Sequence, residues 1–126
     1  MPITYQIVPH ERIVYLKTTG RSSFEEWRDA VLGALSDPAY EPGFGFLSDR
    51  RQQDAPPTAD FAQSVSEFLE ERARNAGGVR WATVSAVEPV YETLRIYSII
   101  AARAGVELRV FKDIEEARWW LTASRG

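Results

Sequence analysis

Short apolar segments alternate along this chain with longer amphipathic segments, and this alternation constrains the fold more than any other feature of the sequence. The short segments either have the two-residue period of half-buried strands or are apolar throughout, whereas the longer ones repeat apolar residues every three or four positions, as helices do. We expect strands at residues 3–7, 12–18, 44–48, 79–85 and 107–111, and helices at residues 24–35, 58–75 and 89–104 and from residue 113 onward.

The order of these elements, β-β-α-β-α-β-α-β-α, predicts an α/β fold. The turn at residues 9–11 joins the first two strands into a hairpin, so these two strands should pair antiparallel. Each later strand follows a helix, which implies parallel strands joined by right-handed crossovers. We therefore predict a single domain over residues 1–126, with four helices and a mixed, mostly parallel five-stranded sheet. The first strand is antiparallel in this sheet, and the second, third and fourth strands are internal.

Capping signals mark the expected helix ends. Ser22 and Ser23 each precede a glutamate by three residues, and the same spacing joins Asp113 to Glu116. In such a capping box, the first side chain accepts a hydrogen bond from a first-turn amide and the glutamate reaches back. Pro89 suits the first turn of the third helix, and Gly77-Gly78 is expected to end the second.

Composition and charge exclude several classes of function. The chain has no cysteine, which rules out disulfides, thiolate nucleophiles and cysteine-ligated metal sites. Its net charge of −3 comes from 15 basic and 18 acidic residues mixed along the chain, so we expect no cationic face for nucleic acid. The sequence has neither an apolar run long enough for a membrane span nor a secretion signal, and the expected location is the cytoplasm.

We predict no catalytic, cofactor-binding or metal-binding residue. A nucleophilic triad needs an imidazole near a hydroxyl, and the single histidine, His10, lies in the expected hairpin turn. Asp49, Asp54 and Asp60 could hold a magnesium ion weakly, but carboxylates spaced along a loop are better explained as solvated. The sequence also lacks the glycine-rich patterns that bind nucleotides.

Asp49-Arg50-Arg51 is the best candidate for a polar site, because it follows a strand at the sheet edge where α/β proteins bind ligands. Guanidinium groups bind carboxylate or phosphate at two points. We expect one docking rim formed by six residues: Asp49, Arg50, Arg51, Thr58, Ser85 and Glu88. In the other interpretation, the arginines only neutralise nearby acids and Thr58 only caps the second helix.

The third and fourth helices carry more apolar surface than a single sheet contact requires. Val90, Leu94 and Tyr97 share one face of the third helix, so that face should meet the sheet. We predict a homodimer or a partner contact through residues on the outward side: Ile96, Ile99, Ile100, Arg103 and Trp119. In the other interpretation, neighbouring helices cover the third helix and Trp119 is an isolated surface aromatic.

Several segments resemble the STAS-like group, which has the fold of the bacterial anti-sigma-factor antagonist SpoIIAA, and most of all its uncharacterised single-domain bacterial relatives. The resemblance covers nearly the whole chain. Its features are the initial hairpin, Gly20 before the first capped helix, the strand ending in Leu47-Ser48-Asp49, the Gly77-Gly78 entry to the fourth strand, and the closing segment 109–121. None of these features is a catalytic signature.

The resemblance implies a non-catalytic protein-interaction or regulatory module, whose partner is another protein or a second copy of the chain. In the antagonists, a partner kinase phosphorylates a serine between the third strand and the second helix. Residues 54–60 occupy that region here, with Thr58 alone at the helix start. The SEC14-type branch of this fold implies an alternative, a carrier of a small apolar ligand or lipid. An acid/base enzyme that uses Asp49 and Glu88 is a distant alternative.

Overall fold

The predicted order of strands and helices is confirmed by the structure, a computed structural model. It describes residues 3–53, 56–76, 79–103 and 105–123, except for the side chains of residues 72–76, 79, 100, 101 and 103. The elements in these ranges are β1 (Ile3–Val8), β2 (Ile13–Thr19), α1 (Phe24–Leu35), β3 (Gly45–Gln52), α2 (Ala59–Ala76), β4 (Val79–Val84), α3 (Glu88–Arg103), β5 (Val106–Phe111) and α4 (Ile114–Ala123).

The five strands form one sheet in the order β1-β2-β3-β4-β5. The β1 strand runs antiparallel to β2, and the other neighbouring pairs are parallel. The mixed sheet and its three internal strands are therefore as predicted, with β1 and β5 at the edges.

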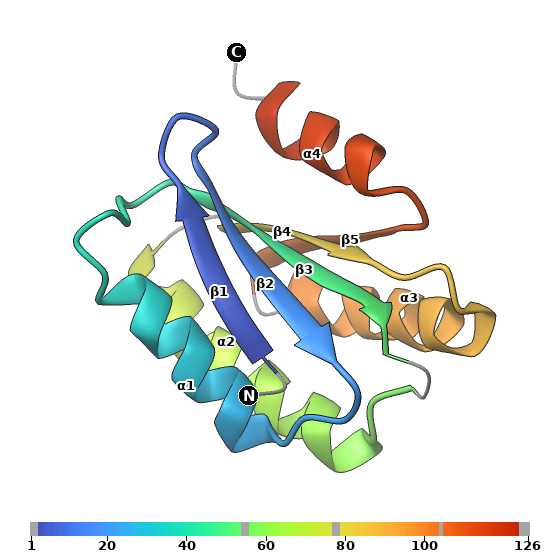
Figure 1. Cartoon of the computed structure of the whole chain (residues 1–126). Coiled ribbons are helices and arrows are strands. Elements are labelled where there is room, and N and C mark those ends of the chain that lie inside the picture. The colour runs from blue at the N-terminus through green and yellow to red at the C-terminus, as the bar shows by residue number, and fades with distance from the viewer. Residues whose placement is uncertain (1–2, 54–55, 77–78, 104, 124–126) are drawn as a thin grey trace.

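The helices divide between the two faces of the sheet. Helices α1, α2 and α3 lie on one face, here called the three-helix face, and α4 lies on the other, the α4 face (Figure 1). Successive side chains of a strand point to opposite faces, so alternate residues supply the two cores. Phe46 and Trp81 pack in the core beneath the three helices, whereas Leu47 and Ala82 pack in the core beneath α4.

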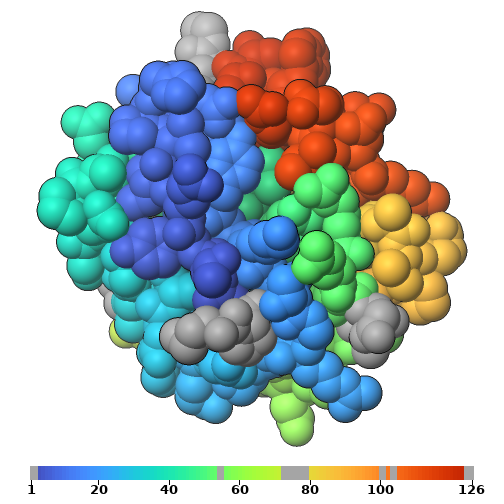
Figure 2. Space-filling view, viewed as in Figure 1, coloured from blue at the N-terminus to red at the C-terminus, as the bar shows by residue number. Residues whose placement is uncertain are grey.

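Helix α4 covers only part of its face. In the space-filling view, atoms of β1 and β2 (blue) and of β3 (green) are visible beside α4 (red) (Figure 2). Within the hairpin, the Tyr15 hydroxyl donates to Glu11 Oε1 at 2.6 Å. Arg118 of α4 forms an ion pair with the same carboxylate, and this contact connects the helix to the hairpin. Burial and the bond to Glu11 raise the pKa of Tyr15 to about 12. The α4 face thus accommodates its polar groups by pairing them.

Ser23, Thr58 and Asp113 each cap a helix start, and the predicted capping box forms at Ser23. Ser23 Oγ accepts from the Glu26 amide at 3.1 Å while the Glu26 carboxylate accepts from the Ser23 amide at 2.9 Å, which completes a capping box. Thr58 Oγ1 accepts from the Phe61 amide at 3.1 Å, and Asp113 Oδ1 accepts from the amide two residues on at 2.8 Å. The predicted cap at residues 77–78 lies outside the described residues.

Strand β3 extends four residues beyond its predicted end at residue 48. Its parallel pairing with β4 reaches Asp49 opposite Val84, and its pairing with β2 continues to Gln52. Asp49, Arg50 and Arg51 are therefore strand residues, and their side chains alternate between the two faces of the sheet.

Candidate functional site

Arg50 and Arg51 lie on opposite faces of the sheet, so the six predicted rim residues do not share one surface. Arg51 points to the α4 face, where its guanidinium binds the Asp49 carboxylate at two points, with Nε 2.9 Å from Oδ1 and Nη2 2.8 Å from Oδ2. These hydrogen bonds hold the pKa of Asp49 below its usual range. Arg50 points to the three-helix face and is only 5% exposed. The extra length of β3 is the cause, because adjacent strand residues face opposite ways.

The other predicted rim residues make local contacts. Thr58 caps α2 and is exposed. Ser85 is fully buried, and its Oγ accepts from the Val87 amide at 3.3 Å. Glu88 forms an ion pair with Lys112 at 3.1 Å. Each side chain therefore has a structural explanation of its own, and Asp54 lies outside the described residues.

A cavity of about 70 Å³ lies between the three-helix face and the helices that cover it. Its walls are mainly apolar and include the rings of Trp27 from α1, Phe61 from α2 and Trp81 from β4. The Trp81 ring stacks on Phe46 with ring centroids 4.5 Å apart and on Trp27 at 5.8 Å, and Phe61 packs edge-on against Trp27. These rings pack against one another and form an apolar wall of the cavity.

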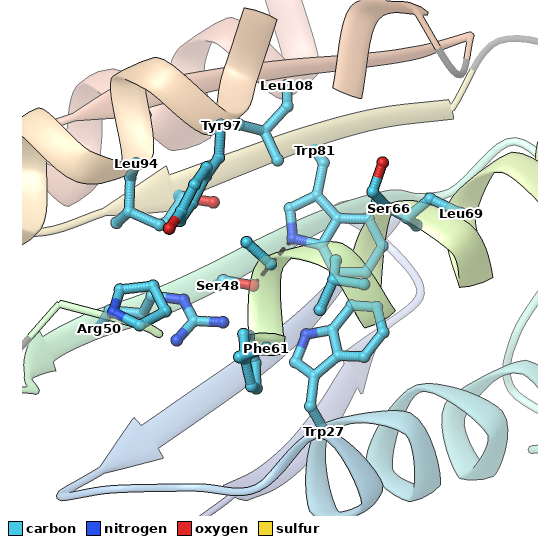
Figure 3. Close-up of a pocket in the computed structure, with 14 residues that line it drawn as sticks. Trp27, Ser48, Arg50, Phe61, Ser66, Leu69, Trp81, Leu94, Tyr97 and Leu108 are labelled. Atoms are coloured by element: carbon cyan, nitrogen blue, oxygen red, sulfur yellow. Dashed lines mark hydrogen bonds between the residues drawn. The ribbon is translucent and has the colours of Figure 1, made fainter. Parts of the chain in front are cut away.

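The hydroxyl of Ser66 on α2 lies toward one end of the cavity, beside Leu69, whereas most of the other polar side chains that line it are gathered toward the opposite end (Figure 3). Arg50 from β3 and Tyr97 from α3 lie at that end, and Trp81 lies toward the other (Figure 3). Ser48 lies between them, and its Oγ accepts from Trp81 Nε1 at 2.8 Å. Thr83 is the register partner of Ser48 on β4 and also lines the cavity. The cavity therefore has an apolar body and a polar end that carries one positive charge.

Arg50 has few partners for a buried charge. Its Nη1 donates to Gln53 Oε1 at 3.0 Å, and its guanidinium lies over the Phe61 ring, 5.7 Å from the centroid. Within the described ranges, no carboxylate pairs with it. Burial lowers the pKa of Arg50 to about 10, so the group still carries its charge at neutral pH. Arginine is rarely buried in proteins unless it is paired, so a buried guanidinium that faces a cavity is unusual.

A wider groove of about 400 Å³ lies outside the cavity, between the starts of α1 and α2. Residues around both helix caps line this groove, among them Arg21, Ser23 and Thr58. Pro57 and Phe61 line both the groove and the cavity, so they lie between the buried space and the surface.

The sequence held one signal for the burial of Arg50. Arg50 follows the buried residues Phe46 and Ser48 at intervals of two, which places all three on one side of a strand. The prediction ended this strand at residue 48 and treated Arg50 as a loop residue. The aromatic walls of the cavity were predicted only as core, because apolar periodicity cannot distinguish a filled core from one with a space in it.

The predicted interface residues lie on two different sides of the molecule. Ile96 and Ile99 on α3 are 61% and 64% exposed, and Trp119 on α4 is 70% exposed, which confirms their outward orientation. Because α3 and α4 cover opposite faces of the sheet, these side chains do not form one surface (Figure 1). The side chains of Ile100 and Arg103 lie outside the described part of the structure.

Among the described residues, no group of three or more histidine, cysteine, aspartate or glutamate side chains is arranged to hold a metal ion. In the same residues, no helix combines the length and the apolar character needed to cross a bilayer.

Comparison with known proteins identifies the fold. No protein-family model matches the chain, and no curated protein matches it by sequence. A solved structure does match: an uncharacterised protein from Shewanella loihica PV-4, described as a member of the DUF3478 family with a SpoIIAA-like fold. The match covers 94% of this chain and 91% of that one, with a TM-score of 0.63 and 17% sequence identity. This chain therefore has a SpoIIAA-like fold, as the resemblance implied.

Proposed function

We propose that this chain is a non-catalytic binding domain that holds a small, largely apolar ligand between its sheet and helices α1, α2 and α3. The observation that carries the proposal is the cavity itself, which has aromatic walls and a few polar groups at one end. Small-molecule sites in proteins are typically concave, mostly apolar and equipped with a few convergent polar groups. This geometry favours the carrier interpretation over a pure protein-docking module.

The chemistry of the cavity supports a binding role without catalysis. Among the described residues, its polar lining consists of a guanidinium and hydroxyl groups and includes no carboxylate or imidazole that could act as a general base. Asp49 and Glu88, the two acids that an acid/base enzyme would use, are bound to Arg51 and Lys112 and do not line the cavity.

Small aromatic probes test the proposal. Benzyl alcohol and benzoate, titrated separately into the full chain, should change the emission of Trp27 and Trp81 and shift amide resonances of residues that line the cavity. Ala62, which lines the cavity from α2, provides a blocking variant: Ala62→Phe should abolish both responses. Its neighbour Gln63 is exposed, so Gln63→Phe should leave binding unchanged. The proposal fails if neither probe binds, or if Ala62→Phe binds them as the wild type does.

A second candidate function is self-association or docking to a protein partner, which the exposed apolar side chains favour. Ile96 and Ile99 lie on the outer side of α3, and Trp119 lies outside α4. Exposed clusters of large apolar groups often mark interaction surfaces, and tryptophan is enriched at the energetic centres of interfaces. The two sites are on opposite sides of the sheet, so each would form its own contact.

Sedimentation velocity over a range of concentrations tests the second candidate. A dimer that dissociates in Ile99→Asp but persists in Trp119→Ala would assign the contact to α3, and the reverse result would assign it to α4. A wild type that stays monomeric at high concentration would exclude self-association through either site.

A further inference from the structure

The charge of Arg50 needs an anion that the described chain does not supply. The guanidinium is 5% exposed, and its one hydrogen bond to a described residue is to the neutral side chain of Gln53. Burying an unpaired charge is costly, and an apolar side chain of similar size could fill the same space. A charge held in such a place is best explained by something that binds to it.

The free donors of Arg50 have the geometry to bind a carboxylate. A guanidinium carries five N–H donors in a rigid planar fork, and Nη1 uses one of them on Gln53. Nε and Nη2 therefore remain free of described partners, and that edge of the fork matches the two oxygens of a carboxylate. Ser48 Oγ accepts from Trp81, so its own hydroxyl hydrogen is available as a further donor. Two residues of β3 thus provide donors toward one end of the cavity.

The single charge selects among anions. One guanidinium neutralises one negative charge, so a bound carboxylate makes the buried pair neutral. A phosphate dianion would leave a second charge in an apolar cavity, because Arg50 is the one cationic side chain among the described residues that line it. The site should therefore prefer an organic monoanion over inorganic phosphate.

The size and walls of the cavity limit the rest of the ligand. The cavity has a volume of about 70 Å³, so it accommodates only a small body. Phe61 and Trp81 line the cavity with apolar ring atoms against which an aromatic or short aliphatic group can pack. A longer body would have to extend past Pro57 and Phe61 into the outer groove.

We infer that the cavity binds a small organic carboxylate, with its carboxylate on the free edge of the Arg50 guanidinium and its apolar body against Phe61 and Trp81. This inference rests on the proposed function and adds the chemical class of the ligand to it. It also assigns Arg50 as the residue that determines specificity for charge.

Matched ligand pairs test the inference on the wild-type chain. Benzoate and benzyl alcohol have nearly the same shape, and hexanoate and hexanol form a second pair; each compound is titrated by calorimetry at constant ionic strength. At least one carboxylate should bind tenfold or more tightly than its alcohol, and inorganic phosphate should not displace it. If each alcohol binds as tightly as its carboxylate, the ligand class is wrong while the proposed function stands. If none of the four compounds binds, both proposals fail.

Two adjacent arginine variants locate the anion. Arg50→Met should lower the affinity for benzoate at least tenfold and leave the affinity for benzyl alcohol within about threefold of the wild type. Arg51→Met is the matched control, because this arginine lies on the other face of the sheet, and it should leave both affinities unchanged. Equal loss in both variants, or no loss in Arg50→Met, would contradict the inference. If Arg50→Met does not fold, the affinities of the wild type for the matched ligand pairs are sufficient to test the inference.

Discussion

Arg50 and Arg51 are neighbours in the sequence, yet one lies buried beneath three helices and the other lies at the surface beside α4. The Arg51 side chain is 46% exposed and binds Asp49 at two points, whereas Arg50 is buried and its guanidinium has, among the described residues, only the side-chain oxygen of Gln53 as a hydrogen-bond partner. The identical chemical group thus stabilises local structure on one face and holds unused donors on the other. The difference shows that the environment of a charge, more than the presence of that charge, indicates a binding site.

The two faces of the sheet repeat this contrast on a larger scale. On the α4 face, acidic and basic groups are matched: Arg118 pairs with Glu11, and Arg80 pairs with Glu107 at 3.4 Å. On the three-helix face, the core is aromatic and apolar around one guanidinium. The paired charges of the α4 face can remain in contact with water, whereas the stability of the three-helix face depends on excluding water from its apolar core.

The aromatic wall of the three-helix face should give the largest effect of any single change. Trp81 is 4% exposed, stacks between Phe46 and Trp27, and donates to Ser48. We expect Trp81→Ala to lower the free energy of unfolding by about 3–5 kcal/mol, as measured by urea denaturation. Trp120→Ala, in the core beneath α4, should lower the free energy of unfolding by less, because that face is stabilised partly by polar pairs. An equal or larger loss in Trp120→Ala would contradict the proposed difference between the faces.

Replacing the two arginines by methionine should change stability in opposite directions. Arg50→Met removes a buried charge that has no counterion in the described chain and keeps a side chain of similar length, so the ligand-free protein should gain about 1–3 kcal/mol. Arg51→Met breaks a pair in which the arginine side chain is 46% exposed and the aspartate side chain 14% exposed, and it should lose about 1 kcal/mol. Urea denaturation of both variants checks this, and a large loss in Arg50→Met would mean that the charge is stabilised internally.

The paired face should also carry the acid sensitivity of the fold. The hydrogen bond from Tyr15 and the ion pair with Arg118 lower the pKa of Glu11 from its usual 4.5. A carboxylate with a lowered pKa stabilises the fold above its unfolded-state pKa, and this stability is lost as the pH falls through the folded-state pKa. Glu11→Gln should cost up to about 1 kcal/mol at pH 7 and progressively less below pH 4.5.

Denaturation of the wild type and of Glu11→Gln, each measured from pH 7 to pH 3, checks this prediction. Arg50→Met serves as the comparison, because Arg50 stays charged throughout this range and its stability difference from the wild type should not depend on pH. Parallel pH curves for Glu11→Gln and the wild type would show that Glu11 does not contribute.

The smallest effects are expected at the exposed apolar positions, which belong to neither core. Trp119→Ala and Ile99→Asp should change the free energy of unfolding of the monomer by no more than about 0.5 kcal/mol. A larger loss in dilute solution would show that these side chains stabilise the fold itself, and it would weaken their assignment as contact surfaces.

Most of the fold was predictable from the sequence because its determinants are local. The period of apolar residues distinguishes strands from helices, and side chains such as Ser23 and Thr58 mark helix starts by capping nearby amides. The element order then leaves few arrangements for a sheet of parallel strands joined by helices. The outward orientation of Ile96 and Trp119 also followed from helical spacing alone.

The candidate site depended on contacts that no local pattern records. Which face Arg50 occupies is determined by the length of β3, and this length is fixed by its pairing with β2 and β4. Whether that face is buried depends on where α1, α2 and α3 pack after the chain has folded over the sheet. The sequence therefore determined the order of strands and helices, the residues that cap the helices, and the alternation of strand side chains between the two faces of the sheet. Only the tertiary structure placed Arg50 in a cavity without a counterion from the described chain, because burial and pairing depend on residues that are distant in the sequence.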